Sequence, residues 1–514
     1  MEALGWLALA VVAIIWSASD YLPDFGGDAA VYCLTANYWS PYATALPTAS
    51  QVAAASTYPP LYPAVLALFG GGISIRYAHY LTAAILVLAL WVVRMFYRGL
   101  GIPAFTASIL TFLSALLPMV RWEALDLHSE PLYLALSCAV LALALAPDAR
   151  GLSLARLSLL GVAVAGALLT RTVGIALLGA VAIHAFRLRS RAWLLPFALG
   201  AGAWIYEASS AHSTGSYLHL FAQHFAQSDE PLTLIWQSFL GGYLAGVIGP
   251  DTPHWLMTVT TALLPLFLIG MVWRAYRGFL DGYYALLYLG IILVWPFSAE
   301  STRLLMPIFP VILGQTAALL TSCKLSFTQS LRTVPVPAMV LVLALITVPD
   351  TIRVAVRLAT PVAPGQATFK RFRDWYDSDP RQATYMLGTY VAMHGILAEI
   401  PKYVPEGDCV FAIKPSIVNL FGQRQAYLPP LPDVPEDAFV GAAAEHNCHY
   451  FLLLNFASPT VPVNMYPYAR VAAHLNILAV ATNPLYPKEI AAALAEWHDS
   501  RDATETGKTT LQPH

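Results

Sequence analysis

The feature that most constrains this chain is a series of apolar stretches, each about 15–20 residues long, that recurs through its first two-thirds. A membrane-spanning helix needs about 20 mostly apolar residues, so the series predicts a bundle of transmembrane helices. We predict eleven spans, at residues 4–18, 77–96, 103–120, 130–146, 157–170, 172–186, 192–208, 255–272, 282–297, 304–322 and 334–349. The short fifth and sixth stretches form either two helices that turn at Arg171 or one interrupted helix, which would make ten spans.

Charged residues are scarce in the whole chain, and most of all in the same region. They make up only 11% of the 514 residues, against about 25% in a soluble domain, which excludes an ordinary cytosolic enzyme. Residues 1–349 contain 15 Lys/Arg and 14 Asp/Glu, whereas the much shorter stretch 350–514 contains 13 and 16. The formal net charge of −2 argues against a nucleic-acid partner. We therefore predict a transmembrane catalytic domain at 1–349 and a separate domain at 350–514.

The positive residues indicate how the spans are oriented. Eleven Lys/Arg lie in one set of predicted loops, and only four arginines lie in the other: Arg76, Arg121, Arg171 and Arg303. Cytoplasmic loops carry the excess of Lys and Arg. We therefore expect the N-terminus to be cytoplasmic and the C-terminal domain to lie outside the cytoplasm.

Two of the predicted outer loops are long, and loops of this length are usually functional or mobile. The first, 19–76, includes a segment at 28–40 that can form a helix lying flat on the membrane. The second, 209–254, contains His212, His219 and His224 among several acids. These histidines lack the i,i+4 spacing with a carboxylate partner that zinc sites prefer. No metal ligand is predicted; a divalent cation stays possible, although the sequence gives no support for one.

The C-terminal domain is predicted to be α/β. Thr384–Ile400 and Pro487–His498 have helical periodicity, whereas Cys409–Ile413 and Tyr450–Leu454 are apolar runs of strand length. Proline- and aspartate-rich turns separate these segments, as at residues 429–433. The segment is long enough to fold as an independent domain.

Two cysteines of this domain, Cys409 and Cys448, lie close to strand-like runs. Disulfides persist outside the cytoplasm, where the domain is predicted to lie. The two residues can pair or remain free thiols, because the connectivity of cysteines cannot be read from sequence alone.

Asp28 follows two glycines shortly after the first span. A carboxylate beside the membrane, on a backbone that can turn, can act as general base for an alcohol, a role that contributes about 10²–10⁴-fold to a rate. An aspartate before an apolar run is also a good helix N-cap. The residues alone leave both interpretations open.

A second group of ionisable residues lies between the third and fourth predicted spans, in the run 121–131. The group comprises Arg121, Glu123, Asp126, His128 and Glu130. Ser129 or Glu130 could cap the following helix, with Pro131 in its first turn. Ionisable residues at the edge of a membrane are nevertheless candidates for function.

The outward arginines oppose the charge rule, so each needs a physical reason. Arg171 and Arg303 suit a phosphate, because a guanidinium offers paired donors and keeps its charge. Arg303 could instead pair with the neighbouring Glu300. Arg76 is interpreted as reaching back to the membrane interface.

Five short motifs follow one another over about 300 residues of the first part of the chain, and the tail contains two more. They are Gly27-Asp28-x-x-x-Tyr32, Tyr58-Pro59-Pro60-Leu61-Tyr62-Pro63, His128-Ser129-Glu130-Pro131-Leu132, Leu169-Thr170-Arg171-Thr172-x-Gly174, Arg303 with Pro307 and Pro310, Lys414-Pro415, and Gly422-Gln423-Arg424. The ordered set resembles the GT-C superfamily of integral-membrane glycosyltransferases. Within it, the set is most similar to bacterial relatives of protein O-mannosyltransferases and of the lipid A aminoarabinose transferase.

The resemblance implies a fold, a reaction and a set of roles. Such enzymes take a sugar from a polyprenyl-phosphate carrier on the outer face of the membrane, here expected to be a bacterial inner membrane. The family's catalytic aspartate in the first loop corresponds to Asp28. Many relatives follow that aspartate with Glu or Gly, whereas Ala29 follows here, so Asp126 or Glu130 would supply a second acid. The residues expected to bind the lipid phosphate or the substrate are Arg303, Arg171, Arg121, His128, Tyr32, Tyr58 and Tyr62.

The predicted reaction is a single displacement. Asp28 would accept the proton of an acceptor hydroxyl on a lipid, glycan or protein, and that oxygen would attack the anomeric carbon with inversion. Outward arginines would neutralise the leaving polyprenyl phosphate, and no cofactor is predicted. One alternative is a transporter or flippase of lipid-linked sugars, although the internal repeats common in transporters are not found. Another is a polysaccharide polymerase or ligase, against which the soluble-looking tail argues.

Overall fold

The computed structural model describes the chain except for residues 1, 23–26, 146–152, 211–230, 249–253, 296–300, 323–334, 360–379, 436–437, 440, 442, 444, 447, 457–460, 462 and 498–514. The described chain divides into two compact units. Unit 1 comprises Met1–Ala18, Ser56–Phe69 and Arg76–Ala359, and unit 2 comprises Ser19–Ala55, Gly70–Ile75 and Thr360–His514. Each unit is described by itself below.

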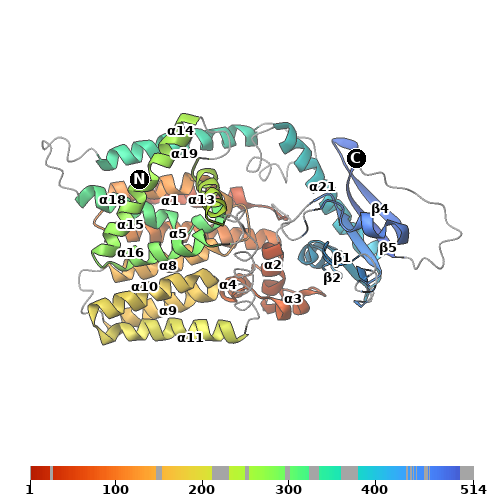
Figure 1. The fold of residues 1–514 in the computed structure, drawn as a ribbon, viewed down its shortest axis with the longest axis horizontal. Coiled ribbons are helices and arrows are strands. Elements are labelled where there is room, and N and C mark those ends of the chain that lie inside the picture. Colours follow the sequence, from red (N-terminus) through yellow and green to blue (C-terminus); the bar gives the residue numbers. More distant parts are fainter. Residues whose placement is uncertain are drawn as a thin grey trace. The chain divides into compact units, whose positions relative to one another are not determined.

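Unit 1 is helical. Its longer elements are α1 (Glu2–Ser17), α4 (Leu61–Leu68), α5 (Ile75–Gly99), α6 (Ala104–Leu116), α8 (Glu130–Ala144), α9 (Leu154–Thr170), α10 (Ile175–Leu188), α11 (Leu194–Ser210), α13 (Pro231–Ile248), α14 (His254–Ala262), α15 (Leu264–Tyr276), α16 (Leu280–Leu293), α18 (Phe309–Ser322) and α19 (Pro335–Ala359). Short helices complete it: α7 (Pro118–Glu123), η1 (Thr172–Gly174), η2 (Arg191–Trp193) and α17 (Ser301–Leu305). Figure 1 shows many of the longer helices lying side by side along a common direction.

Every predicted apolar span coincides with at least one helix of unit 1. Within the described residues, three helical segments are both long and apolar enough to cross a membrane: Ile75–Gly99, Trp255–Tyr276 and Val336–Val356. Eight further apolar helices contain 10–17 residues. The chain is thus an integral-membrane protein with several apolar helices, while the number of eleven spans stays a prediction.

The chain turns back at Arg171, as one of the two sequence interpretations predicts. Helix α9 ends at Thr170, and Arg171 has an extended backbone with φ −153° and ψ 138°. A Cβ atom added to Gly174 would lie 3.0 Å from the Cα atom of Leu168. A continuous helix would hold those residues about 9 Å apart along its axis. The stretch 157–186 therefore forms two helices.

The predicted outer loop 209–254 contains an element that the sequence interpretation missed. Helix α13 occupies Pro231–Ile248 and packs against α7 and α17. The side chains of His212, His219, His224, Asp229, Glu230, Asp251 and His254 lie outside the described residues.

Unit 2 combines the first outer loop with the C-terminal part of the chain. The loop forms α2 (Gly27–Trp39) and α3 (Ala49–Ala55), and α2 confirms the predicted helix at 28–40. The C-terminal part contains α21 (Pro380–Tyr403), α22 (Pro415–Ile417), η6 (Val418–Gly422), α24 (Tyr468–Val471) and η7 (Ala472–His474). Its strands are β1 (Cys409–Ala412), β2 (Gln425–Tyr427), β3 (Tyr450–Leu454), β4 (Leu475–Asn483) and β5 (Tyr486–Trp497).

The five strands form one mixed sheet in the order β2-β1-β3-β5-β4. The first three are parallel, with Val410 opposite Tyr450, and β5 runs antiparallel to both β3 and β4. Strands β1 and β3 are fully buried apolar runs, as their sequences predict. The predicted α/β class is confirmed for the described part of this unit.

One predicted helix of this unit is wrong. The amphipathic periodicity of Pro487–His498 predicts a helix, and its alanines also favour one, yet residues 486–497 form β5. The alanines at 491–493 and 495 are completely or almost completely buried, and β5 lies between β3 and β4. Hydrogen bonds to two neighbouring strands satisfy its backbone, and this tertiary pairing overrides the local preference.

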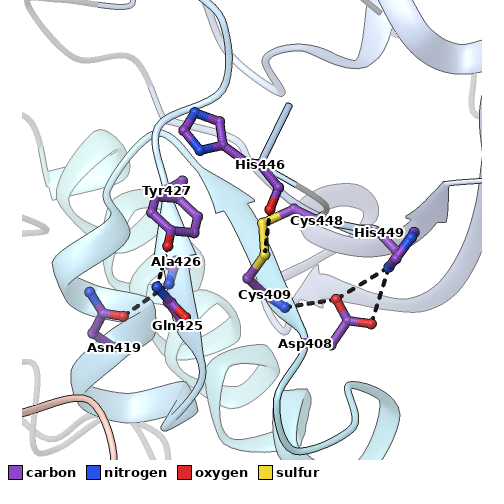
Figure 2. Close-up of a disulfide and its surroundings, with 9 residues drawn as sticks. All are labelled: Asp408, Cys409, Asn419, Gln425, Ala426, Tyr427, His446, Cys448 and His449. Atoms are coloured by element: carbon purple, nitrogen blue, oxygen red, sulfur yellow. Dashed lines mark hydrogen bonds and ion pairs between the residues drawn. A yellow bond between two sulfur atoms is a disulfide. The ribbon is translucent and has the colours of Figure 1, made fainter. Parts of the chain in front are cut away.

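A disulfide joins Cys409, the first residue of β1, to Cys448, and settles the question that the sequence leaves open. Figure 2 shows its surroundings. Asp408 accepts a hydrogen bond from the backbone N–H of Cys409 at 2.8 Å, and its Oδ2 lies 3.3 Å from His449 Nδ1. The bridge fastens the start of β1 to the residues that lead into β3.

Candidate active site

The acidic run 121–131 folds into a tight connection between two helices. Helix α7 ends at Glu123, and α8 begins at Glu130 with Pro131 in its first turn. Ser129 occupies the N-cap position of α8, but its side chain makes no capping hydrogen bond; its Oγ lies 3.4 Å from Arg171 Nη1 instead. The connection buries Glu123, Asp126 and Glu130 completely.

His128 lies between two of these carboxylates. Its Nδ1 is 3.3 Å from Glu123 Oε2, and its Nε2 is 3.2 Å from Asp126 Oδ2. Asp126 is held in place by the backbone N–H of Leu127, which donates to its Oδ1 at 2.7 Å. Burial and the charge of Arg303 lower the pKa of His128, but the carboxylates of Asp126 and Glu123 outweigh them and raise it to about 10. The imidazole is therefore protonated at neutral pH.

Glu130 contacts both of the arginines that the sequence singles out for phosphate binding. Its Oε1 accepts hydrogen bonds from Arg171 Nη1 and from Arg303 Nε. The carboxylate is fully buried, whereas the two arginine side chains keep 14% and 15% of their surface exposed. One buried anion thus places two partly accessible guanidinium groups side by side, although they lie 132 residues apart in the sequence.

Among the described residues, Arg121 forms an ion pair with Asp350 and not with Glu130. Its Nη2 contacts Asp350 Oδ2 in α19, and Arg353 contacts Oδ1 of the same carboxylate. The arrangement repeats that of Glu130, with one carboxylate between two arginines. Arg121 therefore links α7 to α19, and this ion pair favours a structural role.

Asp28 lies in the first turn of α2, where a carboxylate faces the positive end of the helix dipole. The structure describes this helix from Gly27, so Asp28 is inside the first turn rather than before it. The side chain of Asp28 is half-buried. Tyr32, one turn further along, is buried.

The two tyrosines of the proline-rich motif differ in their surroundings. Tyr62 is fully buried in α4, and its hydroxyl lies 2.7 Å from Thr82 Oγ1 in α5. Tyr58 is half-buried before α4, and its backbone N–H donates to Ser56 Oγ at 3.3 Å. The described contacts of Tyr62 are those of a core residue.

One group of side chains in unit 1 could hold a metal ion. Ligand atoms of Glu123, His128 and Glu130 all lie within 4.8 Å of one another. Two carboxylates and an imidazole are suitable ligands for a divalent cation. A metal would need the neutral imidazole and would compete with the proton that Asp126 and Glu123 stabilise.

Two features of this region were not predicted. Glu123 contacts His128, a role that the acidic run alone does not indicate. Asp350 and Arg353 lie beyond the last predicted span, yet they belong to α19. Glu300, the predicted alternative partner of Arg303, lies outside the described residues.

Solved structures of other proteins share the fold of this chain. No protein-family model matches the chain, and no curated protein matches it. The chain is similar to the crystal structure of ArnT from Cupriavidus metallidurans in the apo state, with 14% identity, a TM-score of 0.53, and coverage of 96% of this chain and 98% of ArnT. The structure of the same protein bound to undecaprenyl phosphate gives 14% identity, a TM-score of 0.53 and 99% coverage of both chains.

An archaeal oligosaccharyltransferase, AglB from Archaeoglobus fulgidus, also matches. It shows 14% identity and a TM-score of 0.48 over 87% of this chain and 69% of AglB, which is too low to support a detailed comparison. The ArnT match runs through both units, from the apolar helices to the C-terminal sheet. The chain therefore shares the fold of ArnT over nearly its whole length.

Proposed function

We propose that this protein is a membrane glycosyltransferase that moves a sugar from a polyprenyl-phosphate carrier to an acceptor hydroxyl. The observation that carries the proposal is the pair of guanidinium groups, Arg171 and Arg303, held on one oxygen of Glu130. Paired guanidinium groups recognise phosphate. The similar structure of ArnT with undecaprenyl phosphate bound supports a lipid phosphate as the leaving group.

In the proposed reaction Asp28 accepts the proton of the acceptor hydroxyl. The acceptor oxygen forms a bond to the anomeric carbon while the bond from that carbon to the phosphate oxygen breaks, which inverts the anomeric configuration. Arg171 and Arg303 stabilise the charge that develops on the phosphate. Glu130 holds both arginines on one carboxylate oxygen.

The first test is direct assay of transfer. Purified protein is incubated with radiolabelled polyprenyl-phosphate sugars and a membrane extract, and the labelled product is identified. We expect label to pass from the lipid carrier to a new product, which also reveals the acceptor. Movement of intact labelled lipid across a vesicle membrane, with no new product, would favour the flippase alternative.

The second test addresses the base. Asp28→Asn keeps the shape of the side chain but cannot accept the proton, so we expect turnover to fall by about 10²-fold or more. Donor binding should be nearly unchanged. The control is Asp20→Asn, which neutralises an exposed carboxylate of the same loop and should retain turnover. Wild-type turnover in Asp28→Asn would remove this residue from the mechanism and leave a structural role at the start of α2.

A further inference from the structure

The helix that carries Asp28 belongs to the same compact unit as the C-terminal domain. Within that unit, α2 packs against α22 and η6, the two short helices that follow β1. These partners lie almost 400 residues apart in the sequence. The surroundings of Asp28 are therefore built partly from the tail.

The first contact is beside Asp28 itself. A Cβ atom added to Gly27 would lie 3.4 Å from Ser416 Oγ, which is ordinary van der Waals contact. Ser416 of α22 thus packs against the first turn of α2, next to the residue that precedes Asp28. This contact limits how far the start of the helix can shift toward the tail.

The second contact is a buried hydrogen bond. Thr48 Oγ1 donates to the backbone carbonyl of Asn419 in η6 at 2.9 Å, and Thr48 is only 4% exposed. The side chain of Asn419 in turn accepts from the backbone N–H of Ala426 at 3.0 Å, a bond that Figure 2 also shows. The loop residue Thr48 is therefore tied, through Asn419, to strand β2 of the sheet.

A third set of contacts, the hydrogen bonds of Asn37, connects the same loop to α2. Asn37, near the end of α2, accepts from the backbone N–H of Leu46 at 2.7 Å and donates to the carbonyl of Gly72 at 2.9 Å. Leu46 lies two residues before Thr48. Two sets of buried or partly buried hydrogen bonds, one from β2 to Thr48 and one from Leu46 to Asn37, are therefore joined by the short backbone segment 46–48 and connect the sheet to the helix that carries Asp28.

We infer that Thr48 and Asn419 are positioning residues for Asp28, and that the C-terminal domain is part of the catalytic machinery. The inference rests on the proposed role of Asp28 as the base. A general base works only within hydrogen-bond reach of its proton, and a displacement of about 1 Å can lower a rate about 10²-fold. A loop secured only by its own contacts would leave α2 free to shift by such distances.

The test is Thr48→Val, which keeps the shape of the side chain and removes the donor. We expect kcat to fall about tenfold, because Asp28 is displaced, with the KM for the labelled lipid donor unchanged. Thr48→Ser keeps the hydroxyl and should restore most of kcat. Asn419→Ala keeps the carbonyl that accepts from Thr48 but removes the side-chain bond to Ala426, so it loosens η6 from β2. It should lower kcat in the same way, which provides a second variant if Thr48→Val does not fold.

The matched control is Thr389→Val. Thr389 lies in α21 and accepts from Asn483 at 3.2 Å, so its loss weakens the tail without touching the first loop. If Thr48→Val lowers kcat no more than Thr389→Val at equal loss of melting temperature, the inference is wrong.

Because Thr48 acts through Asp28, Thr48→Val should add little to Asp28→Asn in the double variant. Full activity of Asp28→Asn would overturn the proposed base and this inference together, whereas an inactive Asp28→Asn with a normal Thr48→Val overturns the inference alone.

Discussion

Glu130 is the residue that organises the candidate site. One oxygen of its fully buried carboxylate contacts guanidinium groups from two distant segments. Removing one partner from a buried ion pair is normally strongly destabilising, because the other charge is left buried and unpaired. Here the loss of either arginine still leaves Glu130 with the other. The arrangement therefore allows the proposed phosphate-binding role of each arginine to be tested without leaving this buried carboxylate unpaired.

Arg303→Ala is predicted to weaken binding or transfer of the lipid donor tenfold or more, because a charge-assisted hydrogen bond to phosphate contributes about 1.5–3 kcal/mol. The melting temperature should change little, since Arg171 still pairs with Glu130. Arg303→Lys should recover part of the loss, because the charge remains without the paired donors. Donor titrations and thermal unfolding of the purified variants measure both effects.

Arg353→Ala is the matched control for this prediction. It also removes one of two arginines from a carboxylate, since Asp350 keeps Arg121. It should change donor kinetics little. If Arg303→Ala behaves like Arg353→Ala, the phosphate-binding role moves to Arg171.

His394 gives unit 2 a pH-dependent stability. The ring is 7% exposed and lies edge-on to Tyr21 and Phe421, with centroids 5.0 and 4.8 Å away. Burial lowers the pKa of His394 to about 3. As the pH falls from 6.5 towards 3, the unfolded chain binds a proton here and the folded chain does not. The free energy of unfolding should therefore fall, by at most about 1.4 kcal/mol per pH unit from this group.

We expect His394→Phe to flatten the dependence of the melting temperature on pH between about 6.5 and 4, because the aromatic ring remains and the titration is lost. His449→Phe, at an exposed position, should keep most of the wild-type slope. Equal slopes in wild type and His394→Phe would show that this histidine does not contribute.

At the level of single elements, the long apolar stretches predicted most of unit 1. Each apolar stretch became helical because a helix satisfies its own backbone hydrogen bonds, whatever packs beside it. Strands β1 and β3 were predictable for a related reason, since each is a short, continuous apolar run. Strand β5 was not, because its alanine-rich sequence suits a helix and only its two neighbouring strands select the extended form.

The candidate site was partly predictable for similar reasons. Density of charge at the membrane edge singled out Asp126, His128 and Glu130, and violation of the positive-inside rule singled out Arg171 and Arg303. Which groups meet could not be predicted, because pairing between Arg303 and Glu130 joins residues 173 apart in the sequence. Arg121 met the same sequence criterion as Arg303, yet packing directs it to Asp350.

Packing of the β4–β5 turn on α21 gives a prediction at the scale of elements. A Cβ atom on Gly388 would lie 2.0 Å from Asn483 Oδ1. Asn483 donates to the carbonyl of Tyr385 at 2.9 Å, which fixes the turn on the helix. Gly388→Ala should displace this residue and destabilise unit 2 by about 1–3 kcal/mol.

Gly395→Ala in the same helix is the control. A Cβ atom there meets nothing within 4 Å, so the substitution should stabilise the helix by about 0.5–1 kcal/mol. Urea unfolding followed by circular dichroism compares the two variants. Equal midpoints would contradict the proposed close contact between Gly388 and Asn483.

At the scale of the whole molecule, the proposed chemistry requires the C-terminal domain to lie outside the cytoplasm. The distribution of eleven against four positive residues among the predicted loops is the basis for this orientation. A reporter that is active only in the cytoplasm should therefore stay silent when fused after His514. The same reporter fused after Arg191, in a predicted cytoplasmic loop, should be active. Cytoplasmic activity of the His514 fusion would reverse the orientation and remove the basis for an outward-facing reaction.

The hydrogen bond between Thr48 and Asn419 also has a consequence for how the protein is made. The two residues are 371 positions apart, and ribosomes add about 5–20 residues per second. The first loop must therefore wait about 20–70 s after its own synthesis before its partner in the tail emerges. During that interval the helices from α5 to α19 are synthesised, while the nascent chain contains Asp28 but lacks the contacts that hold α2. On the proposed role of Asp28, we expect a chain released before Asn419 is made to be inserted in the membrane yet inactive.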